Sequence, residues 1–83
     1  MKKVTIYSTP TCHYCEEAKT FLTKFNVKYT AIDVSKDLEQ RKEMIKKSNQ
    51  MGVPVITVGK EVFVGFNWEV KGKLVKLLDI KLN

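Results

Sequence analysis

Two cysteines carry the most evident chemistry in this sequence. Cys12 and Cys15 lie in the segment TPTCHYC, residues 9–15, and they are the only 2 cysteines in the chain. A pair at this spacing can form a structural disulfide, bind part of a metal site or exchange electrons with other thiols. A disulfide here would close a very short loop, so it would contribute little chain-entropy stabilisation. Stability is therefore a poor reason for the pair.

A metal site is the first alternative to redox exchange. A closed zinc site needs four ligands, usually two cysteine pairs or one pair with two histidines. The chain has 1 histidine, His13, which lies between the cysteines. One copy of the chain cannot close such a site, so metal binding would require two copies that share ligands. Two inert, buried cysteines fit poorly with the polar neighbours Thr9 and Thr11. We favour redox exchange.

The flanking residues place the pair where a strand meets a helix. Residues 3–8 are rich in β-branched and aromatic side chains, which is typical of a strand. Cys12 is then expected at the first helical position, where unpaired N–H groups and the helix dipole favour an anion. A free thiol has a pKa near 8.5, so only about 3% is thiolate at pH 7, and a helix N-terminus lowers this pKa. We therefore expect Cys12 to be the attacking nucleophile, with further stabilisation from His13 when that side chain is protonated.

Cys15 is expected one turn into the same helix. The (i, i+3) relation puts it on the same face as Cys12, within reach of a disulfide but more shielded. This suits a resolving thiol, which attacks a mixed disulfide and releases the partner in reduced form. The helix continues with an apolar stripe, and Glu16 and Lys19 are expected on its opposite, outer side. The stripe consists of Ala18, Phe21, Leu22 and Phe25.

The remaining pattern predicts a second strand and a second helix. Residues 28–34 are typical of a strand, and residues 35–49 form a helix in which Asp37 and Gln40 have the spacing of a capping box. The apolar stripe of this helix is thin, so we expect it to be the most exposed helix. That stripe consists of Leu38, Met44 and Ile45.

Two short strands and a final helix complete the pattern. Residues 54–58 and 61–65 surround Gly59-Lys60, a two-residue turn with glycine first, as in a hairpin. Apolar residues then recur at helical spacing through residues 70–78. The order is βαβ followed by αββα, which predicts an α/β fold with one four-stranded mixed sheet flanked by three helices. No linker or repeat interrupts it, so residues 1–83 are expected to form a single domain.

Composition excludes several function classes. The 83 residues carry a formal charge of +6 from 15 Lys and Arg against 9 Asp and Glu, spread along the chain. Nucleic-acid binding would cluster these charges with aromatic residues, so we expect no nucleic-acid partner and only a weak bias toward acidic partners. The sequence lacks an apolar run of about 18 residues, and its start lacks a signal-peptide core of about 7–15. We expect a cytoplasmic monomer with no membrane association.

The order of these motifs resembles a known family. VTIYSTPTCHYC, followed by a helix, GVPV at residues 52–55 and VGF at residues 64–66, resembles the glutaredoxin-like proteins of the thioredoxin superfamily. The resemblance covers nearly the whole chain and is greatest to small glutaredoxin-like and NrdH-type redoxins. It implies a thioredoxin fold and a cis peptide bond between Val53 and Pro54 that faces the cysteines. It also implies no bound cofactor, with glutathione as a possible reductant.

The resemblance further implies a substrate groove. In the family, the backbone at the position of Val53, which follows Gly52, pairs with an extended substrate, and the turn at Gly65 also contacts it. Tyr14 keeps the aromatic residue that the family has between its cysteines. His13 stands where glutaredoxins typically have proline, and a histidine there favours the thiolate form of the nucleophile.

Several positions depart from glutathione-binding glutaredoxins. These proteins usually have a basic residue at the position of Thr9, a glycine at that of Phe66 and an acidic cap at that of Asn67. NrdH-type redoxins also have Gly-Phe and take electrons from thioredoxin reductase, so either glutathione or thioredoxin reductase is the expected electron source. Asn67 has a second interpretation as a helix N-cap. Trp68 is expected either to pack on the core or to anchor a partner.

The sequence thus predicts a small dithiol–disulfide oxidoreductase that acts on protein disulfides or glutathione-mixed disulfides. Within this class, the resemblance also includes dedicated hydrogen donors to ribonucleotide reductase, fed by thioredoxin reductase. A metal or iron–sulfur carrier that uses the same cysteines is the alternative from another class, although cluster-carrying glutaredoxins usually have one cysteine in a CGFS-like stretch. A noncatalytic binding domain is a third class, and the intact cysteine pair argues against it.

Overall fold

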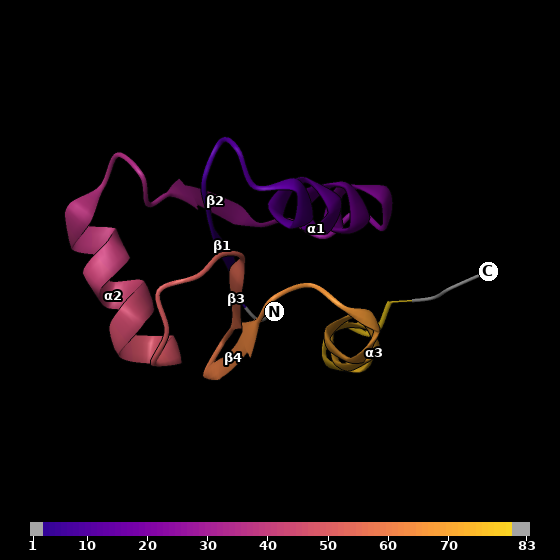
Figure 1. Cartoon of the computed structure of the whole chain (residues 1–83). Helices are drawn as coiled ribbons and strands as arrows, with labels where there is room; N and C mark the ends of the chain where they lie inside the picture. The colour runs from indigo at the N-terminus through magenta and orange to yellow at the C-terminus, as the bar shows by residue number, and fades with distance from the viewer. Residues whose placement is uncertain (1–2, 81–83) are drawn as a thin grey trace.

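The strands form one mixed sheet in the computed structural model, which describes residues 3–80 (Figure 1). They are β1 (Val4–Ser8), β2 (Thr30–Asp33), β3 (Val55–Val58) and β4 (Glu61–Val64), and their spatial order is β2-β1-β3-β4. β1 and β2 are parallel, whereas β3 runs antiparallel to both β1 and β4. The predicted βαβ unit and hairpin therefore share one sheet, as expected.

Three helices cover the two faces of this sheet: α1 (His13–Lys24), α2 (Leu38–Ser48) and α3 (Trp68–Leu77). α1 and α3 lie on one face and α2 lies on the other (Figure 1). This is the predicted architecture of four strands and three helices. The right-handed crossover that parallel strands require is made by α1, which begins directly after the loop that follows β1.

The larger core lies under α1 and α3 and fixes the position of α1. Ala18 and Leu22 of α1 are fully buried, and Phe21 packs against the same cluster, as the apolar stripe predicted. Burying a leucine or isoleucine side chain of this kind contributes about 1.5–3 kcal/mol. The cluster also contains Val4, Ile6, Ile56, Val58, Phe63, Phe66, Val70 and Leu74. These contacts hold the helix that carries both cysteines.

The smaller core lies under α2. Met44 is the one buried residue of this helix, so α2 is the thinly packed helix that the sequence predicted. The prediction for Leu38 was wrong, because 67% of its surface is exposed. Leu38 lies six positions before Met44, and at about 100° per residue the Leu38 side chain lies about 120° away from the buried face.

The ends of the helices and strands differ slightly from the predicted ones. The Asp37 carboxylate accepts a hydrogen bond from the Gln40 N–H at 3.1 Å, while the Asp37 N–H donates to the Asp33 carbonyl at 3.2 Å. The capping box therefore forms in one direction. β2 is shorter than the predicted residues 28–34, because only Thr30–Asp33 pair with β1. Gly59 has a φ of 60°, as expected for the hairpin turn.

Candidate dithiol active site

The candidate residues meet at one end of the sheet. Tyr7 near the end of β1 pairs with Val55 at the start of β3, and Val55 pairs with Val64 at the end of β4. The three segments that follow β1, precede β3 and follow β4 therefore leave the sheet at the same end (Figure 1). A hydrogen bond of 2.8 Å from the Gly65 N–H to the Pro54 carbonyl joins two of them.

Cys12 is the N-cap of α1. The sequence predicted the first helical position, but the backbone of Cys12 is extended, with φ −85° and ψ 109°, and the helix begins at His13. The sulfur of Cys12 accepts a hydrogen bond from the Cys15 N–H at 3.1 Å, which is the bond that a side-chain cap makes. The Cys12 N–H donates to the Thr9 carbonyl at 3.2 Å. The nucleophile predicted from the sequence thus sits directly at the positive end of the helix dipole.

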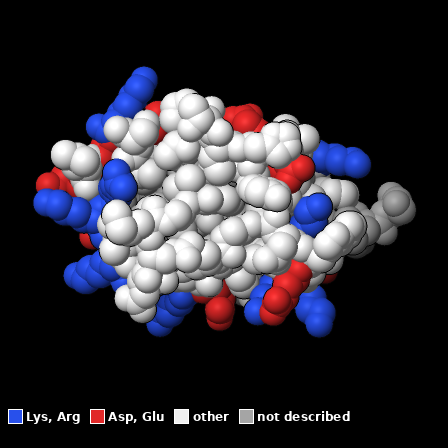
Figure 2. Space-filling model, viewed as in Figure 1, with Lys and Arg blue, Asp and Glu red and all other residues white. Residues whose placement is uncertain are grey.

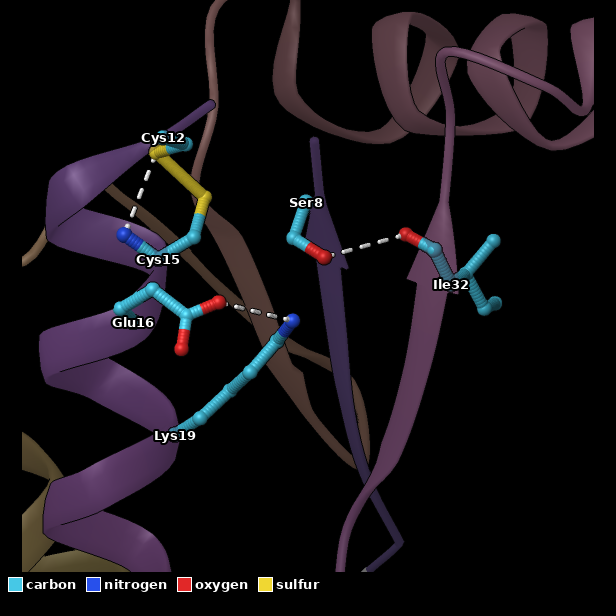
Figure 3. Close-up of a disulfide and its surroundings, with 6 residues drawn as sticks. All are labelled: Ser8, Cys12, Cys15, Glu16, Lys19 and Ile32. Carbon is cyan, nitrogen blue, oxygen red and sulfur yellow. Dashed lines mark hydrogen bonds and ion pairs between the residues drawn. A yellow bond between two sulfur atoms is a disulfide. The ribbon is translucent and has the colours of Figure 1, made fainter. Parts of the chain in front are cut away.

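The two sulfurs lie at disulfide distance, and the Cα atoms of Cys12 and Cys15 are 5.2 Å apart (Figure 3). Cys12 is half-buried, whereas Cys15 has 0% of its surface exposed. The second cysteine is therefore the shielded one, as its helical position predicted. An incoming sulfur can reach Cys12 but not Cys15.

His13 and Tyr14 extend into solvent beside the pair. The His13 side chain is 83% exposed, and its Nε2 lies 3.7 Å from Glu17 Oε1. Tyr14 is also exposed, and its ring centroid lies 6.1 Å from that of His13. Water screens a charge on so exposed a ring, so any effect of His13 on the Cys12 thiolate is weak. The tuning roles of both residues stay predictions.

The segment before β3 contains the cis peptide bond between Val53 and Pro54 that the resemblance implied. Pro54 is buried, Val53 is half-buried and Gly52 is exposed. Among residues 3–80, none accepts a hydrogen bond from the Val53 N–H or donates one to its carbonyl. These backbone groups are available to pair with an extended peptide.

In the segment after β4, Phe66 is a core residue. Phe66 is 6% exposed and its ring centroid lies 5.6 Å from that of Phe21, so its ring packs into the core. Phe66 also lines a depression of about 420 Å³ between α1 and the start of α3, together with residues that include His13 and Lys71. Phe66 therefore packs into the core and also borders this depression, and its place in a substrate groove stays a prediction.

Asn67 is the N-cap of α3, and Trp68 is exposed at its first position. The Asn67 Oδ1 accepts a hydrogen bond from the Val70 N–H at 2.9 Å, which makes Asn67 the N-cap of α3. Trp68 does not pack on the core, because 84% of its surface is exposed. The Lys71 ammonium lies 4.6 Å from the centroid of its ring.

The three loops that meet at the cysteines are uncharged. Residues 8–12, 49–54 and 65–67 contain no Asp, Glu, Lys or Arg, although the chain has a net charge of +6. In Figure 2, the charged side chains lie mainly around the margin of the view, and few lie in the middle, over the loops between α2 and the other two helices. Tyr14, Met51 and Trp68 are large apolar residues that are exposed on or beside these segments.

Charged groups that the sequence did not single out lie behind the pair. Lys19 Nζ is 3.7 Å from Glu16 Oε1, and the Lys19 side chain is 26% exposed, so Lys19 lies outside the apolar stripe, as predicted, but is partly covered. Asp33 ends β2 next to Ser8. Hydrogen bonds from the Ser35 side chain and backbone hold the pKa of Asp33 below its ordinary value, with smaller contributions from Lys36 and Lys19. The spacing of four residues between Cys15 and Lys19 was the available signal.

Metal-binding and membrane-spanning features are absent from the described part of the chain. Within residues 3–80, no three His, Cys, Asp or Glu side chains come together as a metal site. None of the helices in that range is both long and apolar enough to cross a membrane.

Comparisons with known proteins agree with this geometry. The family model described as Glutaredoxin matches residues 4–63. A glutaredoxin-like 8.6 kDa protein of the rubredoxin operon of Clostridium pasteurianum is 40% identical over 76 residues, which cover 92% of this chain and 97% of that protein. Glutaredoxin 1 of Rickettsia prowazekii is 40% identical over 82 residues, with coverage of 92% and 86%.

A solved structure shows the same fold. The crystal structure of a mutant of the thioredoxin-like protein BC3987 has a TM-score of 0.84 and 36% identity, and the match covers 98% of this chain and 100% of that one. The mixed sheet with its three helices is therefore the thioredoxin fold that the resemblance implied. The cysteine pair lies at the start of α1 within the region that the family model matches. The chain belongs to the glutaredoxin family.

Proposed function

We propose that this chain is a dithiol–disulfide oxidoreductase in which Cys12 attacks and Cys15 resolves. The observation that carries the proposal is the difference between the two cysteines. Cys12 is half-buried at the N-terminus of α1, whereas Cys15 is fully buried within disulfide reach of it. When the pair is reduced, the helix dipole and the Cys15 N–H stabilise a thiolate on Cys12.

The reaction proceeds by two thiol–disulfide exchanges. The Cys12 thiolate attacks one sulfur of the substrate disulfide, a bond forms between the two sulfurs, and the other substrate sulfur leaves as a thiolate. Cys15 then attacks the sulfur of Cys12, which forms the Cys12–Cys15 disulfide and releases the second substrate sulfur. The substrate disulfide gains two electrons, the cysteine pair loses two, and the leaving thiolates take protons from water.

Substitution of each cysteine tests these roles separately. Cys12→Ser removes the nucleophile, so reduction of a protein disulfide should fall to the background rate. Cys15→Ser leaves the attack intact and should accumulate a covalent mixed disulfide with the substrate, visible by mass spectrometry under non-reducing conditions. Circular dichroism of both variants controls for folding. Full activity of Cys12→Ser would contradict the proposal.

We further propose that protein disulfides, in a reducing compartment such as the cytoplasm, are preferred over glutathione-mixed disulfides. Glutathione carries two carboxylates, and the three segments around the cysteines contain no Lys or Arg to bind them. A protein segment instead offers backbone groups that can pair with the N–H and carbonyl of Val53, and apolar side chains that can contact the exposed Tyr14, Met51 and Trp68.

The electron donor distinguishes the two substrate classes. The oxidised protein is assayed for NADPH consumption in two coupled systems, one with glutathione and glutathione reductase and one with thioredoxin reductase alone. Faster turnover with thioredoxin reductase is expected. Efficient turnover with glutathione at micromolar concentrations would overturn the preference while leaving the dithiol mechanism intact.

A further inference from the structure

Lys19 lies one helical turn after the buried cysteine. It follows Cys15 by four residues on α1, a spacing that places the two side chains on one face of the helix. Long helical side chains lie back toward the N-terminus, and Lys19 does so, because its Nζ reaches to 3.7 Å from Glu16 Oε1. In Figure 3, the ammonium lies below the disulfide, on the side of α1 nearer Ser8 of β1.

The burial of Lys19 separates it from other ion-paired lysines. Its side chain is 26% exposed, compared with 45% for Lys47 and 57% for Lys73, which also pair with a glutamate on their own helices. A charge that is partly removed from water is screened less and acts more strongly on its neighbours. Lys19 is therefore the better placed of these three to affect a nearby titrating group.

The charged groups near Lys19 come from two elements. α1 supplies Glu16 and Lys19, and the end of β2 supplies Asp33, whose lowered pKa owes most to Ser35 and a smaller part to Lys36 and Lys19. The nearest part of β1 supplies the neutral Ser8, whose hydroxyl donates to the Ile32 carbonyl at 3.5 Å.

The other charged side chains near the cysteines have partners of their own. On α1, His13 pairs outward with Glu17, and beyond the β4–α3 turn the Lys71 ammonium lies over the rings of Phe66 and Trp68. Lys19 is thus a cation between two carboxylates, Glu16 and Asp33, at the back of the site.

We propose that Lys19 is a positioning residue for the resolving step, in which its ammonium stabilises the thiolate of Cys15. This inference rests on the proposed function. Burial disfavours the anionic form of a thiol, and Cys15 is fully buried. A cation one turn away offsets part of this cost and raises the thiolate fraction. The Cys15 thiolate then attacks the sulfur of Cys12, the Cys12–Cys15 bond forms, and the partner sulfur leaves with the electron pair of the broken bond.

The test follows each cysteine separately in the reduced, full-length protein. A small aromatic disulfide that releases a coloured thiolate is added in stopped flow. The first coloured thiolate leaves when Cys12 attacks, and the second leaves when Cys15 resolves the mixed disulfide. The absence of a first phase would refute the proposed function, whereas the inference concerns only the second phase.

Lys19→Gln should change the pH profile of the second phase. Loss of a nearby cation raises a thiol pKa by about 1 unit, which lowers the thiolate fraction about tenfold at pH 7. A more basic thiolate is intrinsically more nucleophilic, with a Brønsted coefficient of about 0.5, so the net rate falls about threefold. Above the raised pKa, where both proteins are fully ionised, the variant should resolve about threefold faster than the parent. The first phase should change little.

Two further variants make the result specific. Glu16→Gln removes a facing carboxylate and should shift the profile in the opposite direction, so it also tests the idea if Lys19→Gln fails to fold. Lys24→Gln is the matched control, with the same charge change at an exposed position of the same helix. An equal slowing at every pH, an unchanged second phase in Lys19→Gln, or the same shift in Lys24→Gln would overturn the role of Lys19.

Discussion

Thr9 occupies a position where a single side chain can alter the use of glutathione. Its carbonyl accepts a hydrogen bond from the Cys12 N–H at 3.2 Å, so the backbone, and not the hydroxyl, maintains the turn into α1. The side chain is half-buried in a segment without charge. A cation introduced here would have no competing carboxylate on residues 8–12.

Thr9→Lys should improve turnover with glutathione. A lysine can pair with a glutathione carboxylate, and one charged contact at a half-exposed site is expected to lower the apparent KM for glutathione about three- to tenfold. The measurement is the NADPH-coupled assay with glutathione reductase. Thr23→Lys, which adds the same charge at the far end of α1, is the control. An equal gain in the control would show that only the net charge of the protein matters.

Residue roles were predictable where the signal was local. The greater burial of Cys15 and the cap at Asn67 follow from a few adjacent residues, and the structure shows both. The exposure of Trp68 and the partial burial of Lys19 depend on how α3 and α1 sit against the sheet. Residue spacing along one helix does not report such packing, so the degree of exposure of these two side chains could not be predicted from the sequence.

At the scale of elements, the start of α3 depends on one cap. The Asn67 amide oxygen accepts a hydrogen bond from the Val70 N–H, and Asn67 directly follows Phe66, whose ring is buried in the larger core. This cap therefore fixes where the helix begins relative to the Gly65 turn at the active site.

Asn67→Ala should destabilise the protein by about 1 kcal/mol, because the first turn of α3 loses its side-chain acceptor. In a domain of this size, that change lowers Tm by about 4–8 °C. Urea unfolding followed by circular dichroism measures it, and Asn67→Asp, which keeps a capping oxygen, should retain most of the stability. A full loss in Asn67→Asp as well would mean that the amide has a role other than capping.

Most elements were predictable from a local pattern. In α1 the buried residues Cys15, Ala18 and Leu22 repeat at helical spacing, whereas β1 and β3 are buried throughout and were indicated by their β-branched composition. α2 was less well described, because one buried methionine is enough to attach it to the sheet and the flanking apolar residues carry no directional signal. Leu38 is apolar like the stripe residues, but its angular position on the helix points it away from the buried face.

At the scale of the whole molecule, most charged side chains lie away from the three loops that meet at the cysteines. A net charge of +6 on 83 residues produces self-repulsion, while the segments at the cysteine end of the sheet are neutral. The ion pairs within helices, such as Glu43–Lys47 and Glu69–Lys73, are exposed and contribute little to stability.

Added salt should therefore affect stability and catalysis differently. Screening of self-repulsion should raise Tm by a few degrees between low and about 0.5 M sodium chloride, where the Debye length falls below about 5 Å. The initial rate with a small neutral disulfide should change little, because the disulfide is neutral and the three loops that meet at Cys12 carry no charge. Calorimetry and the rate assay measure the two effects. A Tm that falls with salt would show that the ion pairs outweigh the repulsion.

The hydrogen bond to the sulfur of Cys12 links the reduction of the cysteine pair to the stability of α1. Cys12 Sγ accepts the Cys15 N–H in the disulfide form, but a thiolate at the same place is a charge-assisted acceptor and the stronger cap. Reduction therefore stabilises the start of the helix. By the same linkage, a well-formed helix favours the reduced form of the cysteine pair. In this linkage, each 1.4 kcal/mol by which the thiolate stabilises α1 raises the reduction potential by about 30 mV relative to the same pair in an unfolded chain. The twelve residues of α1 act in this way as part of the redox couple itself.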